Sequence, residues 1–94
     1  MAEVVTWVSA QIAADRHDEV SGPLSAAIEA GLPSSIEQTM LVRDRDELGI
    51  ITIWSRREDL DAMIASGEEP LARRLLRSAG GAPVVRVLEV VARS

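Results

Sequence analysis

Four stretches of the chain place their side chains with a period of two, which is the spacing of a β-strand. They cover residues 3–12, 35–43, 48–54 and 84–92, and the third and fourth are especially rich in isoleucine and valine. β-Branched residues of this kind pack well on a pleated surface. In the first stretch, one face carries Val4, Thr6, Val8, Ala10 and Ile12, and the other carries Val5, Trp7, Ser9 and Gln11.

A first helix is predicted between the first two strands, over residues 18–32. Its apolar residues recur at helical spacing and form one stripe. That stripe consists of Val20, Leu24, Ala27, Ile28 and Leu32. Asp18 or Ser21 is expected to cap the start, where Pro23 suits the first turn, and the run 31–33 ends the helix.

A second helix is predicted directly after Trp54. Ser55 and Glu58 have the spacing of a capping box, in which the serine side chain accepts a backbone N–H bond. Residues 66–70 break the pattern, so we expect the helix to be kinked or to start again there. The Gly80-Gly81 pair is expected to end it.

The resulting order is strand, helix, two strands, helix, strand. This βαββαβ order is that of the ferredoxin-like α+β fold, a four-stranded antiparallel sheet with both helices on one face. With 94 residues the chain is long enough for only one hydrophobic core, so residues 1–94 are predicted to form a single domain.

Both faces of the predicted sheet are apolar. In the third strand, Leu48, Ile50 and Trp54 lie on one side, and Ile51 and Ile53 lie on the other. Two helices can cover only one face, and the second would leave a large apolar surface in water. We therefore expect a homodimer in which a second copy covers the other face.

Composition narrows the choice of partners and chemistry. The formal net charge of −5 disfavours a nucleic acid or an anionic membrane as partner. The absence of cysteine and the presence of one histidine disfavour a metal site. The N-terminal sequence does not resemble a signal peptide, and no apolar run is long enough to span a membrane, so we expect a cytoplasmic protein.

Three segments together carry a resemblance to a known family. Residues 49–60 form a strand that ends in Trp54, followed by serine and an acidic helix start; residues 65–70 interrupt the second helix; and residues 84–91 form a closing strand. The chain resembles the antibiotic-biosynthesis-monooxygenase-like (ABM) family of dimeric α/β barrels. That resemblance implies a pocket between sheet and helices and, in some members, oxygenation of polyketide quinols without a cofactor.

The haem-degrading branch of that family is not supported. The resemblance implies an Asn on the first strand and a Trp and a His on the second helix for that activity. This chain has no Asn, the Trp position is Met63, and the His position falls near Arg73 or Arg74.

Six residues are candidates for a ligand pocket. They are Trp7, Ser9, Gln11, Trp54, Met63 and Arg86. The tryptophans can each serve as a pocket wall or as a core or interface anchor, and Arg86 can bind an oxyanion or lie on an edge strand. The sequence does not assign the face of Trp7 to a pocket or to a dimer interface.

The remaining polar candidates have simpler interpretations. We expect His17 in a surface loop, and Glu69, Arg73 and Arg77 as an exposed ion-pair ladder on one helical face. Glu37 and Glu89, both on strands, are the candidate carboxylates for acid–base chemistry. No metal or cofactor is expected.

Two functions stay open. The first is a cofactor-independent monooxygenase or isomerase acting on an aromatic or polyketide-like molecule. The second is a non-catalytic dimer that binds a ligand or serves assembly. An apolar cavity with polar residues at its base favours the enzyme, and a space filled by Trp7, Trp54 and Met63 favours the second function.

Overall fold

The computed structural model describes residues 4–92. It contains the strands β1 (Val4–Gln11), β2 (Ile36–Asp44), β3 (Glu47–Trp54) and β4 (Val84–Glu89). The helices are the short 3₁₀ turn η1 (Ala14–Arg16), α1 (Asp18–Ala30), α2 (Arg57–Ala65) and α3 (Leu71–Ser78). The predicted second helix is therefore two helices, separated at the interruption that the sequence shows.

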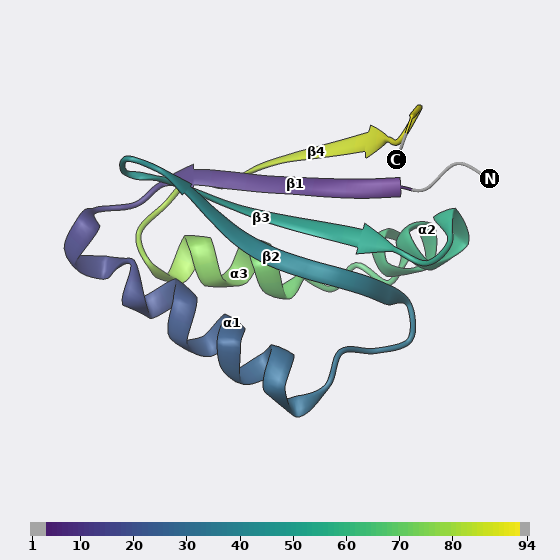
Figure 1. Ribbon diagram of the computed structural model, residues 1–94, viewed down its shortest axis with the longest axis horizontal. Coiled ribbons are helices and arrows are strands. Elements are labelled where there is room, and N and C mark those ends of the chain that lie inside the picture. The colour runs from purple at the N-terminus through teal and green to yellow at the C-terminus, as the bar shows by residue number, and fades with distance from the viewer. Residues whose placement is uncertain (1–3, 93–94) are drawn as a thin grey trace.

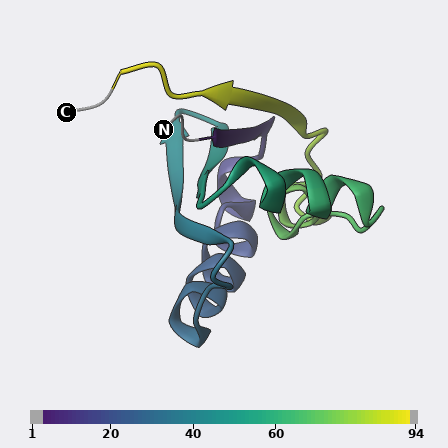
Figure 2. The ribbon, with the colours of Figure 1, turned by 90° about the vertical axis from the view of Figure 1, so that its right-hand side faces the viewer.

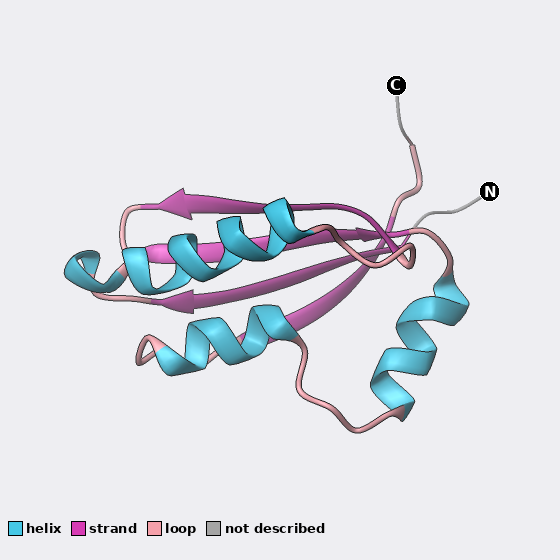
Figure 3. Cartoon of the chain, turned by 90° about the horizontal axis from the view of Figure 1, so that it is seen from below, coloured by secondary structure: helices cyan, strands magenta, loops and turns pink. Residues whose placement is uncertain are grey.

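The four strands form one antiparallel sheet in the order β2-β3-β1-β4. Figure 1 shows α1 and α3 below the sheet and α2 near the end of β3, and Figure 3, seen from below, shows α1 in front of the strands. Leu24 of α1 and Leu76 of α3 pack in one core cluster with Val8, and Leu60 of α2 packs in the other with Val4, on the same side of β1. All the helices thus lie on one face, which confirms the predicted ferredoxin-like α+β fold. None of the helices in residues 4–92 is long and apolar enough to cross a membrane.

The helix-facing side of the sheet carries the core. Alternate residues of β1 and β3 are buried there beneath the helices, because a period of two sends them all to one side. They are Val4, Thr6, Val8 and Ala10 of β1, and Leu48, Ile50, Thr52 and Trp54 of β3. Val20 and Leu24 of α1 and Leu76 of α3 belong to the larger of two apolar clusters, together with Val8, Ala10, Leu48 and Ile50 of the strands.

The other side of the sheet, here called the open face, has no helix over it. Residues that are register partners on neighbouring strands lie on the same face of a sheet, so three rows of such partners identify the residues of the open face. The central row contains Arg86, Trp7, Ile51 and Met40; the flanking rows contain Leu88, Val5, Ile53 and Gln38, and Val84, Ser9, Gly49 and Val42. Most of these side chains are apolar, and Val84 is 59% exposed and Leu88 40% exposed.

The predicted N-terminal caps of α1 and α2 are wrong, whereas α1 ends at Gly31 as predicted. The residue before α1 is His17, and α1 contains Pro23 in its second turn rather than its first. Arg56 precedes α2 without a side-chain cap, because Ser55 Oγ instead donates to the Ser34 carbonyl oxygen at 2.9 Å. That carbonyl belongs to the loop before β2, so a tertiary contact competes with the local capping box.

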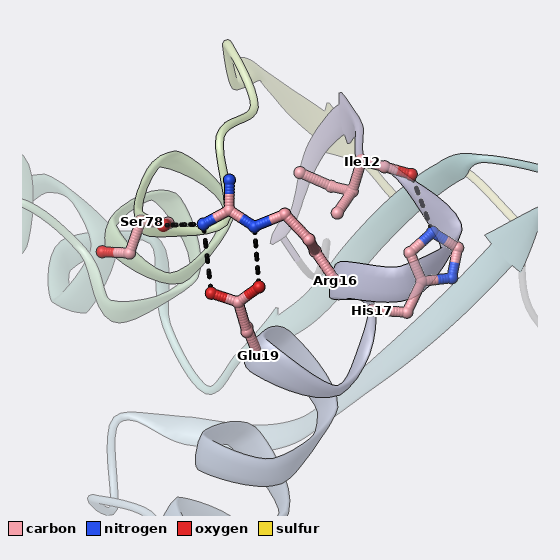
Figure 4. Close-up of polar contacts among 5 residues, drawn as sticks. All are labelled: Ile12, Arg16, His17, Glu19 and Ser78. Carbon is pink, nitrogen blue, oxygen red and sulfur yellow. Dashed lines mark hydrogen bonds and ion pairs between the residues drawn. The ribbon is translucent and has the colours of Figure 1, made fainter.

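Arg16 links the start of α1 to the end of α3. Its guanidinium donates to both carboxylate oxygens of Glu19, at 2.7 and 3.1 Å, and to the Ser78 carbonyl oxygen at 3.2 Å (Figure 4). Beside it, His17 Nε2 lies 2.8 Å from the Ile12 carbonyl oxygen, which places a donated proton on Nε2. His17 is therefore half-buried at the N-terminus of α1 rather than in an open loop.

The pKa of the Glu19 carboxyl can be used to test its contact with Arg16. The hydrogen bonds from Arg16 lower the pKa of Glu19 below its usual 4.5. A carboxyl with a lower pKa in the folded chain stabilises the fold above its unfolded pKa, and this contribution is lost as the pH falls through the folded value. In an NMR titration we expect Arg16→Gln to raise the Glu19 pKa toward 4.5. Since the pair is exposed, high salt should raise it too; an identical titration of Glu19 in the wild type and the variant contradicts the assignment.

Candidate ligand cavity

A cavity of about 750 Å³ lies between the helix-facing side of the sheet and the helices. Figure 2 shows how the elements around it are arranged, with α1 running downward from the sheet and the α2–α3 segment at its side. All four strands contribute to the floor. Floor residues are Thr6, Val8, Ile36, Thr39, Ile50, Thr52, Trp54, Val85 and Val87.

The walls of the cavity are mainly apolar. Leu24 of α1, Leu60 and Met63 of α2, and Leu71 and Ala72 of α3 contribute them. Exposed residues such as Ile64, Glu68 and Arg73 also line the space, so it reaches the surface between α2 and α3. A largely apolar space of this size with a few polar groups is typical of a small-molecule site.

A row of three threonines crosses the floor. Thr52 of β3 is the register partner of both Thr6 of β1 and Thr39 of β2. All three side chains face the cavity, and Thr6 and Thr52 are only 6% and 7% exposed. The chain contains no other threonine. Every threonine of the protein therefore lies side by side under one cavity.

The row divides the hydrophobic core in two. On one side, Val8 and Ile50 belong to the larger apolar cluster; on the other, Val4, Trp54 and Leu60 form the smaller one. Because buried polar groups cost free energy unless they are hydrogen-bonded, threonines at this place need partners. Trp54 Nε1 donates to Thr6 Oγ1 at 3.1 Å, and the Thr39 and Thr52 hydroxyl oxygens lie 3.1 Å apart.

Two of the three carboxylates that line the cavity, Asp59 and Glu69, are paired with arginines; the third, Glu68, is exposed. Arg56 donates to both oxygens of Asp59, at 3.1 and 3.4 Å, and Arg77 donates to Oε2 of Glu69. The contact with Asp59 raises the pKa of the exposed Arg56. Among the described protein groups, the second oxygen of Glu69, Oε1, is buried without a hydrogen-bond partner.

The predicted ladder of Glu69, Arg73 and Arg77 is wrong in one respect. Glu69 precedes α3, which begins at Leu71, so the spacing of four between Glu69 and Arg73 is not a helical one. Glu69 pairs instead with Arg77. Both residues line the cavity, as does Arg73, so the ion pair belongs to the cavity rim rather than to an isolated helical face.

The six candidate residues from the sequence divide between the two faces of the sheet. Trp54 and Met63 line the cavity. Trp7, Ser9 and Arg86 lie on the open face, on the side of the sheet away from the cavity, and Gln11 is exposed at the end of β1. Alternation along β1 explains this: Thr6 and Val8 point to the cavity, so Trp7 and Ser9 point away.

Trp7 packs on the sheet itself. A Cβ atom placed on Gly49 comes within 2.7 Å of the outer ring atom Cη2 of Trp7. The indole thus lies over Gly49, whose register partner is Ser9. The structure therefore places Trp7 and Ser9 together, but as part of the open face.

The remaining polar candidates lie elsewhere. Glu37 and Glu89 are exposed strand residues, and neither they nor His17 line the cavity. Within residues 4–92 no group of three or more His, Asp or Glu side chains is arranged to hold a metal ion.

The threonine row was not predicted from the sequence. Its signal was present: each of the three threonines lies near the middle of a predicted strand, and Thr6 shares a face with buried valines. Only the register between the strands, which the sequence does not specify, shows that the three positions coincide.

No protein-family model and no curated protein matches this sequence. Solved structures do match it along almost its whole length. A crystal structure of a protein of unknown function from Nitrosomonas europaea has a TM-score of 0.72 and 13% identity, covering 100% of this chain and 94% of that chain.

Two further structures have names that refer to function. SnoaB from Streptomyces nogalater, a cofactor-independent oxygenase, has a TM-score of 0.66 and 14% identity, covering 97% of this chain and 95% of its own. A candidate antibiotic biosynthesis monooxygenase from Caulobacter crescentus has a TM-score of 0.64 and 18% identity, covering 97% and 92%. The chain thus has the fold of these proteins, and its resemblance to the ABM family is supported at the level of the fold.

Proposed function

We propose that this protein is a homodimer that binds a small aromatic molecule in its cavity and oxygenates or isomerises it without a bound cofactor. The observation that carries the proposal is the cavity itself. Its walls are apolar, its floor carries three hydroxyl groups, and Trp54 and Met63 border the space without filling it. An apolar space of this size that opens to the surface and has hydroxyl groups on its floor is typical of a small-molecule site, whereas a core that serves only packing is close-packed.

The fold supports the same proposal. SnoaB is named a cofactor-independent oxygenase, and this chain follows its fold over 97% of its length. The identity of 14% leaves the residues of the cavity free to differ. The activity is therefore argued from the cavity of this chain, and the fold adds only plausibility to it.

The chemistry open to such a cavity depends on positioning and on exclusion of water. A quinol that loses a proton can reduce dioxygen directly; one oxygen atom then enters the ring and the other leaves as water, so that a hydroquinone and O₂ give a hydroxyquinone and water. Apolar walls from α1, α2 and α3 replace water around the reacting anion. Isomerisation requires the same proton removal, followed by proton return at another atom.

A binding function without catalysis is the second candidate. It is favoured by the side chains of the cavity, which include no histidine, tyrosine or cysteine among the lining residues. Oxygen consumption separates the two candidates. With 1,4-naphthohydroquinone, an oxygenase consumes O₂ faster than the uncatalysed reaction, whereas a binding protein leaves the rate unchanged or slows it.

The homodimer is proposed on the open face. Its three rows are mainly apolar and no helix covers them. Burying such a surface against a second copy recovers about 25 cal/mol for each Å² of apolar area. A two-fold axis through this face would bring Trp7 of each copy against the other sheet and leave both cavities on the outside of the dimer.

The two tryptophans give a direct test of ligand position, since Trp54 lines the cavity and Trp7 lies on the open face. We expect 1,4-naphthoquinone, which absorbs in the range of tryptophan emission, to quench fluorescence saturably in Trp7→Phe, where only Trp54 remains. In Trp54→Phe, where only Trp7 remains, quenching should be much weaker at the same concentrations. Stronger quenching in Trp54→Phe would place the ligand on the open face, and no saturable quenching in either would contradict the proposed cavity site.

A further inference from the structure

We propose that the threonine row recognises a hydrogen-bond-accepting oxygen of the ligand, namely a ketone or quinone oxygen or the oxyanion derived from it. This inference rests on the proposed function, because it assumes that the cavity holds the ligand. It adds the residues that recognise the oxygen of such a ligand, Thr6 and Thr52.

Thr6 is the first of the two donors. Indole Nε1–H can only donate, so in the contact with Trp54 the hydroxyl oxygen of Thr6 must accept. The hydroxyl proton of Thr6 is then left over. Among the described residues no protein acceptor receives it, and the side chain faces the cavity with only 6% of the residue exposed. A ligand oxygen above β1 satisfies this proton.

Thr52 is the second donor, and Thr39 has the role that Trp54 has for Thr6. Either hydroxyl of the Thr39–Thr52 pair can be the donor. A ligand oxygen above Thr52 selects the arrangement in which Thr39 donates to Thr52, so that the proton of Thr52 turns to the ligand. Thr6 and Thr52 then each accept one bond and donate another, and such a chain strengthens the outer bond.

The charged groups of the cavity are less suited to this role. Asp59, Glu68 and Glu69 are carboxylates, which would repel an oxyanion. Arg73 and Arg77 are cations, but both are exposed on α3 rather than placed on the floor. Thr6 and Thr52, in contrast, lie on adjacent strands in direct register. Two fixed O–H donors at the bottom of an apolar space form a preorganised site for a carbonyl oxygen, and they favour it further as negative charge develops on it.

The test compares two ligands that differ only in this oxygen, 1-tetralone and tetralin. Binding is followed by calorimetry, or by Trp54 fluorescence in the Trp7→Phe background. We expect the wild type to bind the ketone more tightly than the hydrocarbon. Thr6→Val or Thr52→Val, which keep the shape of the side chain, should weaken ketone binding about three- to tenfold each and leave tetralin binding unchanged.

Three variants control the interpretation. Thr52→Ser keeps the hydroxyl and should retain the preference for the ketone, and Ser9→Ala removes a buried hydroxyl from the opposite face and should have no effect. Trp54→Phe removes the indole N–H that donates to Thr6 but keeps an aromatic ring in the cavity wall. It should therefore reduce the preference for 1-tetralone over tetralin. Circular dichroism and melting curves establish that each variant is folded.

The outcomes separate this inference from the proposed function. If neither ligand binds the wild type, the cavity site itself fails and the inference fails with it. If both ligands bind, but with equal affinity or with a ratio that the two valine variants do not change, the cavity site stands and the role of the threonines is refuted.

Discussion

We expect Ile51→Glu to convert the protein from a dimer to a monomer. Ile51 lies in the central row of the open face, between Trp7 and Met40 on the neighbouring strands. In a dimer closed through this face, the carboxylate would be buried between the apolar side chains of Trp7 and Met40. The one cation of the row, Arg86, lies on β4, on the far side of Trp7. A buried unpaired charge costs several kcal/mol, which corresponds to a dissociation constant raised about a thousandfold or more. Sedimentation velocity or native mass spectrometry measures the change directly.

A second substitution of the same kind controls for the added charge. Ile64 is 59% exposed on α2 and lies at the cavity rim, so Ile64→Glu should leave the protein dimeric. If Ile51→Glu folds poorly, Val84→Glu makes the same test at the margin of the face, where the side chain is 59% exposed and costs little in the monomer. A wild-type monomer, or a dimer that survives both open-face substitutions, would refute the proposed interface.

The strands and their order along the chain could be predicted because period-two patterns of isoleucine and valine are strong local signals. The same patterns assigned Leu48, Ile50 and Trp54 to one side of β3 and Ile51 and Ile53 to the other, as the structure has them. These patterns do not indicate which side of the sheet the helices cover. For Trp7 that choice decides between a pocket residue and an open-face residue, and it depends on tertiary packing.

The lining of the cavity was harder to predict from the sequence, because it depends on contacts between residues that are far apart along the chain. Ser55 has the spacing of a helix cap, yet its hydroxyl bonds to Ser34, 21 residues earlier in the chain. The three threonines are separated by 33 and 13 positions and meet only through the strand register. Polar residues on an otherwise buried face were the one available hint, and Thr6 among valines was such a case.

The two adjacent glycines at the end of α3 also differ in what the sequence could predict: it predicts the end of the helix, but not the tertiary contact that follows. Gly80 has a φ of 93°, and its N–H donates to the Arg77 carbonyl oxygen, as a glycine that ends a helix does. Gly81 N–H donates to the Leu76 carbonyl oxygen, which completes the turn. The sequence predicted this helix end. It did not predict that Gly81 also lies against β1 and the segment after it.

We expect Gly81→Ala to destabilise the protein by about 2–3 kcal/mol, because the position has no room for a methyl group. A Cβ atom there would lie 2.5 Å from Ile12 Cδ1, 2.8 Å from Ala10 Cβ and 3.1 Å from the Leu76 carbonyl oxygen. Ile12 is 1% exposed and Ala10 5%, so neither can move into solvent. Urea denaturation followed by circular dichroism measures the free energy of unfolding.

The matched control is Gly22→Ala in α1, where a Cβ atom would meet nothing within 4 Å. Alanine favours a helix over glycine by about 0.5–1 kcal/mol, but its methyl group lies before Pro23, which opposes the gain. The net change at Gly22 should therefore stay below about 1 kcal/mol. A loss at Gly81 no larger than the change at Gly22 would contradict the close contact.

A double-mutant cycle identifies the atom responsible. Ile12→Val removes Cδ1, the atom nearest to the added methyl group, and alone should cost about 0.5–1.5 kcal/mol because it leaves a small void. If the clash with Cδ1 dominates, the two substitutions together should cost less than the sum of the single changes, by at least about 0.5 kcal/mol. Simple additivity would instead assign the loss to the two contacts that remain, with Ala10 Cβ and with the Leu76 carbonyl oxygen, because neither atom can turn away from the added methyl group.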